Sequence, residues 1–498
     1  MNNINKYPRR QFLQLAQIAL GSGVGIWLGS SPHARSFDRP TEQSAYYVSP
    51  TGKDSNPGTL QQPWQTIHQA ANVLKAGETV YIRGGKYQIN QTIQPKNSGE
   101  PGKWINYVGY PGEKPIIDAD QIEVGPRVGQ PPFPHDQGAF QIERKHHIKV
   151  QNLTLINSHK AGFTVRESHY IQLYNNTVIN TFASGIAIWD HSSHQKILGN
   201  TVIGANNLEM QLSYPEVPAN RQAPHEAISM GRVQYFEIAY NHVSSCYKEG
   251  IDCKRSCSHG KVHHNYVHHS GHQGLYVDGS RDILENVEMF HNVVHDCECG
   301  IAISTERGLA VNDIKIHHNL VFNNRATGIF ISRWGEDNFR QNIEIYNNTI
   351  HHNGYGDGSS NQPYWLTGGL YFYSTNIKNI RVFNNIISDN DYFQIGYSQD
   401  YQPEGLAEKN IQIEFNWIFN QNQVTYPVYL EEWAKDYVYE IKGNQSVEAE
   451  PNFKNPTIGN FYLRVAPKNH QPQQTWGAFP PGTAETFWWV VNFPPIID

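Results

Sequence analysis

Residues 250–267 read GIDCKRSCSHGKVHHNYV, and residues 274–294 read GLYVDGSRDILENVEMFHNVV. Both stretches begin with Gly and alternating apolar residues, and both end, after a turn, on the pattern Asn-x-Val. The same order returns along the chain in repeats that begin at Gly162, Gly185, Ala227, Gly250, Gly274, Gly300, Gly328 and Gly369. Their second halves end on Asn176, Asn200, Asn241, Asn265, Asn292, Asn319, Asn348, Asn385 and Asn416. Such a recurring phrase indicates a solenoid in which each repeat forms one coil.

Within each half-repeat, apolar and polar residues alternate with period two, which is the pattern of a short strand with one buried face. Most neighbouring repeats begin 23 to 28 residues apart, and two carry longer insertions. Because no helical segment lies between these strands, they can stack only in parallel, one coil on the next. The sequence therefore predicts an all-β fold, a right-handed parallel β-helix, with the recurring Asn forming a hydrogen-bonded ladder in one turn.

The ends of the chain depart from the repeat, as the ends of a solenoid must. A helical stretch that ends near Leu74 predicts an N-terminal helical cap, and an irregular last coil is expected near the C-terminus. We therefore divide the chain into four expected parts. These are a signal peptide at 1–36, the cap and first coils at 45–140, the β-helix repeats at 141–448, and a C-terminal cap and tail at 449–498.

Arg9 and Arg10 precede an apolar stretch at 15–29, an order that resembles a twin-arginine export signal. We expect the protein to be exported to the periplasm or out of the cell. A membrane anchor is the alternative interpretation of the same stretch. Since the stretch is short and contains Gln17 and several Gly, we expect no permanent membrane span.

Only 17% of the residues are charged, and the formal net charge is -6. This balance provides no basic field for a phosphate backbone and argues against nucleic acid as the main partner. The five Cys are expected as buried thiols or one disulfide, because their spacing does not match zinc sites. His264, His291 and His318 each precede a ladder Asn, which predicts stacked imidazoles. We expect the protein to be a monomer.

The N-terminal stretches YYVSPTGKDSNPGT at 46–59 and IRGGKY at 82–87 resemble the start of family 9 pectate lyases. Several β-helix glycoside hydrolases share this phrase. The resemblance covers about residues 45–120 and implies an exported carbohydrate-active enzyme, without choosing its reaction. Family 9 pectate lyases carry an Asp cluster for Ca²⁺ and a catalytic Lys, which this chain matches by residue type alone.

In a strand that follows the repeat Gly, the second and fourth residues lie on the outer face, where we expect them to face solvent. This register places Asp252, Lys254 and Asp278 together on two consecutive coils. Because stacked coils are about 4.8 Å apart, Lys254 should lie directly against Asp278, and Asp252 about 8 Å from Asp278 on the diagonal. Glu226 in the coil below and Glu306 in the turn above can flank this group.

Two reactions fit the group. For β-elimination on a uronic polysaccharide, Lys254 is the candidate base and needs a lowered pKa, while Arg307 or Arg333 could clamp the substrate carboxylate. Hard oxygen ligands could hold Ca²⁺ at Asp252, Asp278 and Glu226. For glycoside hydrolysis with inversion, Asp252 and Asp278 are the candidate carboxyl pair.

Either reaction could use flat apolar rings to stack the sugars of a polysaccharide substrate, and the outer face offers Trp189, Tyr276, Tyr371 and Tyr373. Two non-catalytic interpretations remain beside the enzymatic ones. Lys254 and Asp278 could form an ion pair that only joins neighbouring coils. The solenoid could also bind glycans without cleaving them.

Overall fold

The computed structural model describes residues 45–125, 133–210, 224–355, 367–374, 376–397, 410–419, 428–429, 445–446, 451–456, 460–464 and 477–479. The chain divides into two units, Met1–Gln43 and Ser44–Asp498, and every described residue belongs to the second unit. The expected export signal at 1–36 and most of the expected tail lie outside the described residues. Among the described helices, none has the length and apolar character needed to cross a membrane.

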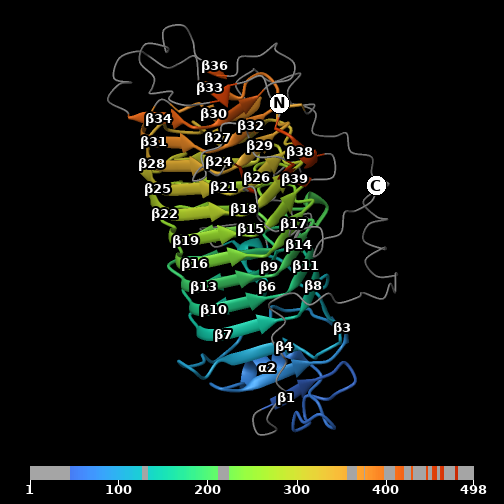
Figure 1. Ribbon diagram of the computed structural model, residues 1–498. Coiled ribbons are helices and arrows are strands. Elements are labelled where there is room, and N and C mark those ends of the chain that lie inside the picture. The colour runs from blue at the N-terminus through green and yellow to red at the C-terminus, as the bar shows by residue number, and fades with distance from the viewer. Residues whose placement is uncertain are drawn as a thin grey trace. The chain divides into compact units, whose positions relative to one another are not determined.

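Most described strands of the second unit form three parallel sheets, which we call A, B and C, and successive coils contribute their strands in turn (Figure 1). Sheet A contains β1 (Ala45–Val48), β2 (Thr79–Ile82), β4 (Ile105–Gly109), β7 (His146–Gln151), β10 (His169–Tyr174), β13 (Ser193–Leu198), β16 (Gln234–Ala239), β19 (Ser258–His263), β22 (Ile283–Phe290), β25 (Ala310–His317), β28 (Phe339–Tyr346), β31 (Ile377–Phe383) and β34 (Ile411–Glu414).

Sheet B contains β3 (Gly85–Gln88), β5 (Pro115–Asp118), β8 (Thr154–Ser158), β11 (Thr177–Thr181), β14 (Thr201–Ile203), β17 (His242–Ser244), β20 (Tyr266–His268), β23 (Val293–His295), β26 (Leu320–Phe322), β29 (Thr349–His351), β32 (Ile386–Ser388), β35 (Trp417–Phe419) and β37 (Gln445–Ser446). Sheet C contains β6 (Gly138–Glu143), β9 (Ala161–Arg166), β12 (Ile186–Trp189), β15 (Ile228–Gly231), β18 (Ile251–Lys254), β21 (Leu275–Asp278), β24 (Ile301–Ser304), β27 (Thr327–Ile331), β30 (Gly368–Phe372), β33 (Ile395–Tyr397) and β36 (Val428–Tyr429). The predicted parallel β-helix is confirmed.

The core follows from the register of these strands. In sheet C, Ile228, Ile251, Leu275 and Ile301 are Cα partners on successive coils, and all four side chains are fully buried. Since a buried Ile or Leu side chain stabilises a fold by about 1.5–3 kcal/mol, each coil adds a similar increment to the same continuous core. The inward side of the predicted alternation is therefore confirmed.

The predicted asparagine ladder is also confirmed. Asn241 donates from its backbone N and from Nδ2 to the Oδ1 of Asn265, at 3.0 and 2.9 Å. Asn265 in turn donates to the Oδ1 of Asn292, and the same contacts continue from Asn176 to Asn416. A second, shorter ladder runs through Asn324, Asn353 and Asn390. The ladders satisfy buried backbone groups where each coil turns.

The predicted row of imidazoles is present, but its rings are tilted by 42° and 46° to one another and are not stacked face to face. The rings of His264, His291 and His318 follow one another with centroids 5.0 Å apart. Their backbone φ angles are 52°, 53° and 55°, in the left-handed region that Asn, Asp and His adopt more readily than other side chains. The five Cys are all free and buried, so the structure favours the first of the two alternatives given for them.

The first and last described segments depart from the regular coils in different ways. At the N-terminus, the helix α2 (Ile67–Val73) is capped by the Thr66 hydroxyl, which accepts from the Gln69 backbone N at 3.1 Å. At the other end, β38 (Phe453–Asn455) and β39 (Asn460–Leu463) pair antiparallel. Instead of forming a last coil, they pack with Phe322 and Trp417 of sheet B, on the side away from the main core.

Candidate active site

Asp252, Lys254, Tyr276 and Asp278 do lie on the outer face of sheet C, but most of this group is covered by other side chains. Asp252, Tyr276 and Asp278 expose only 1%, 3% and 5% of their surface. The expectation that these side chains face solvent is therefore wrong. Strand alternation predicts the side of a sheet on which a residue lies, but neighbouring side chains on that side decide whether water reaches it.

Lys254 is the centre of this group. It is the Cα partner of Asp278, as the repeat register predicts. Its ammonium nevertheless contacts the Oε2 of Glu226 and lies 3.8 Å from the Oδ2 of Asp252. Ser229 donates to the same Glu226 oxygen at 2.7 Å. The amine is therefore turned toward the coil below, and its ion partners are Glu226 and Asp252.

The two Asp carboxyl groups have different surroundings. Oδ1 of Asp278 accepts from the Ser280 backbone N at 2.8 Å. Oδ1 of Asp252 is buried without a hydrogen-bond partner among the described residues. A buried oxygen in that position costs free energy while it is charged and unpaired. Asp252 is therefore better suited to the protonated form.

The charges of the group are distributed unevenly. Burial, reinforced by the Glu226 charge, raises the pKa of Asp252 well above its usual value, and burial with Glu306 does the same to the pKa of Asp278. Burial also opposes the charge of Glu226, but Lys254, Lys248 and His225 together outweigh it and lower the pKa of that carboxyl. The surroundings thus favour the ionised form of Glu226 and shift Asp252 and Asp278 toward their protonated forms.

The same surroundings determine the state of Lys254. Burial opposes its charge, but Glu226 and Asp252 outweigh this effect and raise the pKa of the ammonium above its usual range. A lysine base needs the opposite shift. Lys254 is therefore held as a fixed positive charge, and this disagrees with the lowered pKa that its predicted role as base requires.

The predicted Ca²⁺ ligands do not assemble into a coordination sphere. Within the described residues, no three His, Cys, Asp or Glu side chains come together in an arrangement that could hold a metal ion. The ammonium of Lys254 lies between Glu226 and Asp252, where a cation shared by these two carboxylates would lie. The donor set therefore does not fit Ca²⁺ in this arrangement, and calcium stays a prediction.

The predicted sugar-stacking rings are mostly covered. Tyr371 exposes 2% of its surface and stacks on Phe330, with ring centroids 5.7 Å apart. The Tyr276 hydroxyl donates to Oε1 of Glu306 at 3.1 Å. Half-buried Tyr373 carries the guanidinium of Arg333 at 4.8 Å from its ring centroid. These rings form an aromatic cluster on the upper coils of sheet C, and their predicted role in substrate binding stays a prediction.

The predicted carboxylate clamps lie apart from Lys254. Arg333 follows β27, two coils beyond Asp278 in β21, which is a separation of about 10 Å along the solenoid. Arg307 is exposed in the turn after β24. Neither side chain makes an ion pair with the Lys254 group among the described ion pairs, so their predicted roles stay predictions.

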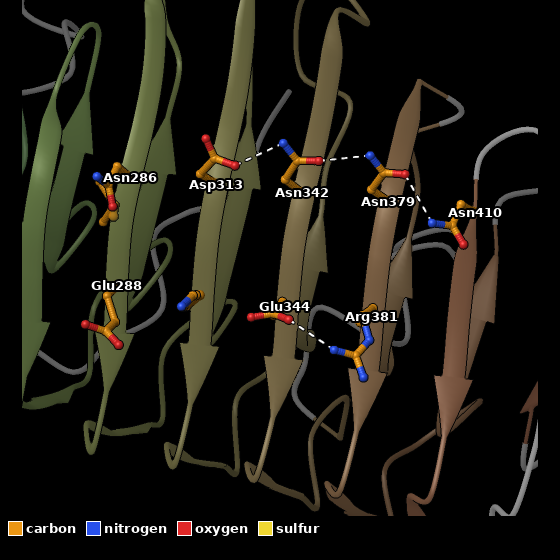
Figure 2. A pocket seen from close by; sticks show the side chains of 10 residues that line it. Asn286, Glu288, Asp313, Asn342, Glu344, Asn379, Arg381 and Asn410 are labelled. Carbon is orange, nitrogen blue, oxygen red and sulfur yellow. Dashed lines mark hydrogen bonds and ion pairs between the residues drawn. The ribbon is translucent and has the colours of Figure 1, made fainter.

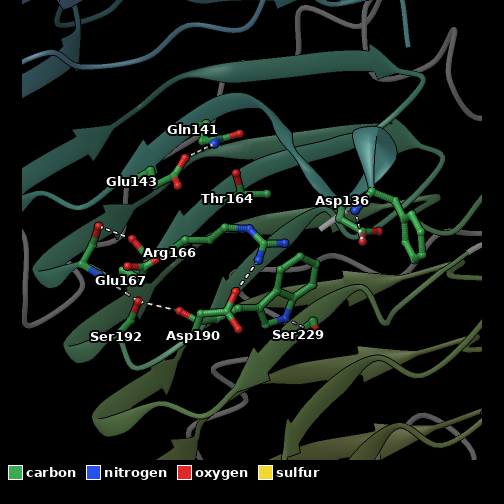
Figure 3. Close-up of polar contacts among 12 residues, drawn as sticks. Asp136, Gln141, Glu143, Thr164, Arg166, Glu167, Asp190, Ser192 and Ser229 are labelled. Carbon is green, nitrogen blue, oxygen red and sulfur yellow. Dashed lines mark hydrogen bonds and ion pairs between the residues drawn. The ribbon is translucent and has the colours of Figure 1, made fainter. Parts of the chain in front are cut away.

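The last predicted ring, Trp189, belongs to a polar group that the sequence reasoning missed (Figure 3). Its indole N donates to the Ser229 hydroxyl at 3.0 Å, and its ring lies 4.6 Å from the guanidinium of Arg166. Arg166 also pairs with Asp190. Since Ser229 donates to Glu226, this group and the Lys254 group are joined through one hydroxyl.

The same indole contacts His225, whose Nε2 lies 3.0 Å from Oδ1 of Asp136 in the short helix η1 (Pro134–Asp136). Burial opposes the charge of Asp136, but the His225 contact outweighs it and lowers the pKa of Asp136. The partners come from segments 89 positions apart in the chain. The regular spacing of the repeat contains no signal for such a contact.

A concave surface on the outer face of sheet A is a different feature (Figure 2). It is crossed by a row of hydrogen-bonded side chains in which Asn342 donates to Asp313 and Asn379 donates to Asn342, each at 2.9 Å. Beside this row, Arg381 pairs with Glu344 and Glu414. These polar groups satisfy one another, so the side chains on this surface join neighbouring coils. None of the predicted site residues is among them.

Two family models match the chain. Residues 46–211 match the model described as Pel9A-like, right handed beta helix region, and residues 137–313 match the model described as right handed beta helix region. Both matches agree with the right-handed parallel β-helix of the structure. The first coils are similar to the Pel9A-like form of that helix, which confirms the resemblance identified in the N-terminal phrase.

Individual relatives match parts of the chain. The uncharacterized protein YwoF of Bacillus subtilis is 27% identical over 395 residues, which are 69% of this chain and 75% of YwoF. Pectate lyase PEL9 of Emericella nidulans is 34% identical over 112 residues, 22% of this chain and 27% of the lyase. The solved structure of pectate lyase Pel9A is 12% identical with a TM-score of 0.47, covering 88% of this chain and 95% of that one.

Proposed function

We propose that the protein is a polysaccharide-degrading enzyme that cleaves acidic polysaccharide by β-elimination. The observation that carries this proposal is the Lys254 ammonium, held charged among Glu226, Asp252 and Asp278 on the outer face of sheet C. The local similarity to PEL9, which is a pectate lyase, and the Pel9A-like first coils support the choice of a lyase.

The group supplies the three tasks of an elimination. The fixed charge of Lys254 stabilises the negative charge that develops beside the substrate carboxylate. Glu226, the ionised carboxylate, accepts the proton from the carbon next to that carboxylate. As the carbon–oxygen bond to the next sugar breaks, protonated Asp278 donates its proton to the leaving oxygen. The products are a chain with a new carbon–carbon double bond and a chain with a free hydroxyl.

A second candidate, an inverting glycoside hydrolase, is favoured by one observation. The pKa of Glu226 is lowered while the pKa of Asp278 is raised, which is the division that a base and an acid require. The spacing of the repeat instead predicted Asp252 and Asp278 as the pair. The pKa values of both carboxyls are raised, so these two residues do not divide into a base and an acid. In a hydrolase, Glu226 would activate water and Asp278 would protonate the glycosidic oxygen.

Incubation with polygalacturonate, alginate and neutral glycans, with and without a chelator, tests the proposal. A lyase yields an unsaturated product that absorbs in the ultraviolet. New reducing ends without that absorbance would replace the lyase by the hydrolase, and binding without cleavage across the panel would leave a glycan-binding solenoid. Loss of product with chelator would support the Ca²⁺ prediction. We expect Asp278→Asn to abolish cleavage in a folded protein, and full activity of that variant would refute the assigned acid.

A further inference from the structure

Arginines follow the strands of sheet C on three consecutive coils. Arg232 comes after β15, Arg255 after β18, and Arg281 in the turn after β21. The backbone N of Arg232 donates to the Lys254 carbonyl at 3.4 Å, and that of Arg255 donates to the Asp278 carbonyl at 2.8 Å. The backbones therefore stay in register beyond the strands, with successive coils about 4.8 Å apart.

This arginine row is poorly neutralised by the described residues. Arg232 pairs with Asp282, where Nε and Oδ2 are 3.3 Å apart. The side chains of Arg255 and Arg281 form no hydrogen bond or ion pair with other described residues. Burial, followed by the charges of Arg232 and Arg281, lowers the pKa of Arg255, while Asp190 and Asp282 act in the opposite direction.

Such an arrangement has a cost in the protein alone. Like charges on neighbouring strands destabilise a sheet, and this chain has a net charge of -6 with few charged residues to place. Elsewhere in the solenoid, neighbouring coils place opposite charges together, as where Arg381 lies between Glu344 and Glu414. The exception lies on the coils that carry the Lys254 group, and Arg255 directly follows Lys254 in the sequence.

The row is also accessible. Arg281 is exposed, and about a third of the Arg232 and Asp282 side chains is exposed, whereas Lys254 and Glu226 expose 13% and 9%. A ligand can therefore reach the arginines before it reaches the buried group. A planar guanidinium binds a carboxylate through two parallel hydrogen bonds, a geometry that an ammonium cannot provide.

We propose that Arg232, Arg255 and Arg281 form a binding row for the carboxylates of consecutive uronic acid units, so that an acidic polysaccharide lies along the edge of sheet C in the direction of coil stacking. The inference rests on the proposed function and deepens it, because it states which groups of the substrate are recognised and how the chain is aligned. Asp282, which already contacts Arg232, is the carboxylate that the ligand displaces or shares.

The test measures binding of an oligogalacturonate of defined length, a neutral oligosaccharide of equal length and a single-stranded oligonucleotide. The variants are Arg255→Gln and Arg281→Gln, and Arg381→Gln on sheet A is the matched control. We expect each row variant to weaken oligogalacturonate binding about tenfold at low salt, with a smaller effect at high salt. The control should bind as the parent does, and Arg255→Gln should not lower the melting temperature, because it removes a like charge.

The binding test can succeed or fail independently of the proposed lyase activity, because binding needs no cleavage. Loss of binding in the row variants with no cleavage product from the parent protein would support the row and reject the lyase. If the parent protein cleaves polyuronate while Arg255→Gln and Arg281→Gln bind and cleave it with unchanged Kd and KM, that result would overturn the proposed binding row. Failure of the parent to bind oligogalacturonate would overturn it too, as would binding of the oligonucleotide with the same loss in both variants.

Discussion

Replacing Asn265 by Ala removes the middle of the main asparagine ladder and gives the sharpest stability test. The side chain is fully buried and makes four hydrogen bonds. Oδ1 accepts from the backbone N and Nδ2 of Asn241, while Nδ2 donates to the Ile238 carbonyl and to Oδ1 of Asn292. The Ala substitution leaves the neighbouring core side chains unchanged, but it removes the amide that these partners contact.

The magnitude follows from the partners left behind. Oδ1 of Asn292 keeps the backbone N of residue 265 as a donor, so it remains satisfied. The Asn241 backbone N–H, one Asn241 Nδ2 hydrogen and the Ile238 carbonyl lose their partners. Since each buried unsatisfied group costs about 1–3 kcal/mol, we expect the free energy of unfolding to fall by about 4 kcal/mol. That loss is a large fraction of the stability of an ordinary domain.

Denaturant unfolding of the parent and variant measures this change, with Gln234→Ala as the control for an exposed amide on the neighbouring coil. The control should change stability by less than about 0.5 kcal/mol. Amide hydrogen exchange should accelerate at Asn241 and much less at Asn348, since coils contact only their neighbours. A loss no larger than that of the control, or exchange that is unchanged at Asn241, would refute the reasoning.

Further predictions concern buried charges and acid. Lys254→Met leaves the Glu226 carboxylate without the ammonium that it contacts. The free energy of unfolding should therefore fall by about 3–5 kcal/mol in thermal or denaturant unfolding. An unchanged stability would contradict the ion pair. Burial lowers the pKa of His291 to about 4, so the folded state binds fewer protons than the unfolded state and stability should decline as pH falls from about 6.5 to 4. His291→Asn should flatten this decline, and an identical pH profile would argue against it. Burial also lowers the pKa of Lys160 to about 8. Lys160→Met should therefore raise the free energy of unfolding by about 1–3 kcal/mol at pH 7 and remove its pH dependence between about 8 and 10.5. A destabilised variant would show that the contacts of Lys160 to Thr92 and Gln137 matter more than the cost of its burial.

The repeat could be read from the sequence because each coil follows the same local rules. Ile251 and Cys253 point inward since strand side chains alternate, and Asn265 marks the turn because its amide can bond the backbone of the adjacent coil. The pairing of Lys254 with Asp278 followed from the same register. These features depend on positions within one period, so the spacing of residues contains them.

The candidate site depended on more than the period. The contact of the Lys254 amine with Glu226 is a choice of rotamer, and strand register does not determine it. The contact between Asp136 and His225 joins segments outside the repeated phrase. Arg232, Arg255 and Arg281 were visible as residues that follow successive strands, but only the structure shows that Arg232 pairs with Asp282 while Arg255 lies among like charges.

The sequence by itself determined the parallel β-helix, the inward rows and the ladders, because these arise from short-range alternation repeated at nearly constant spacing. Only the tertiary structure decided which outward residues are buried, which carboxyls hold protons and whether Lys254 can act as a base. Those properties depend on desolvation and on charges brought together from different coils and loops, and electrostatic effects in a buried site are decided by distances of a few ångströms that no sequence spacing specifies.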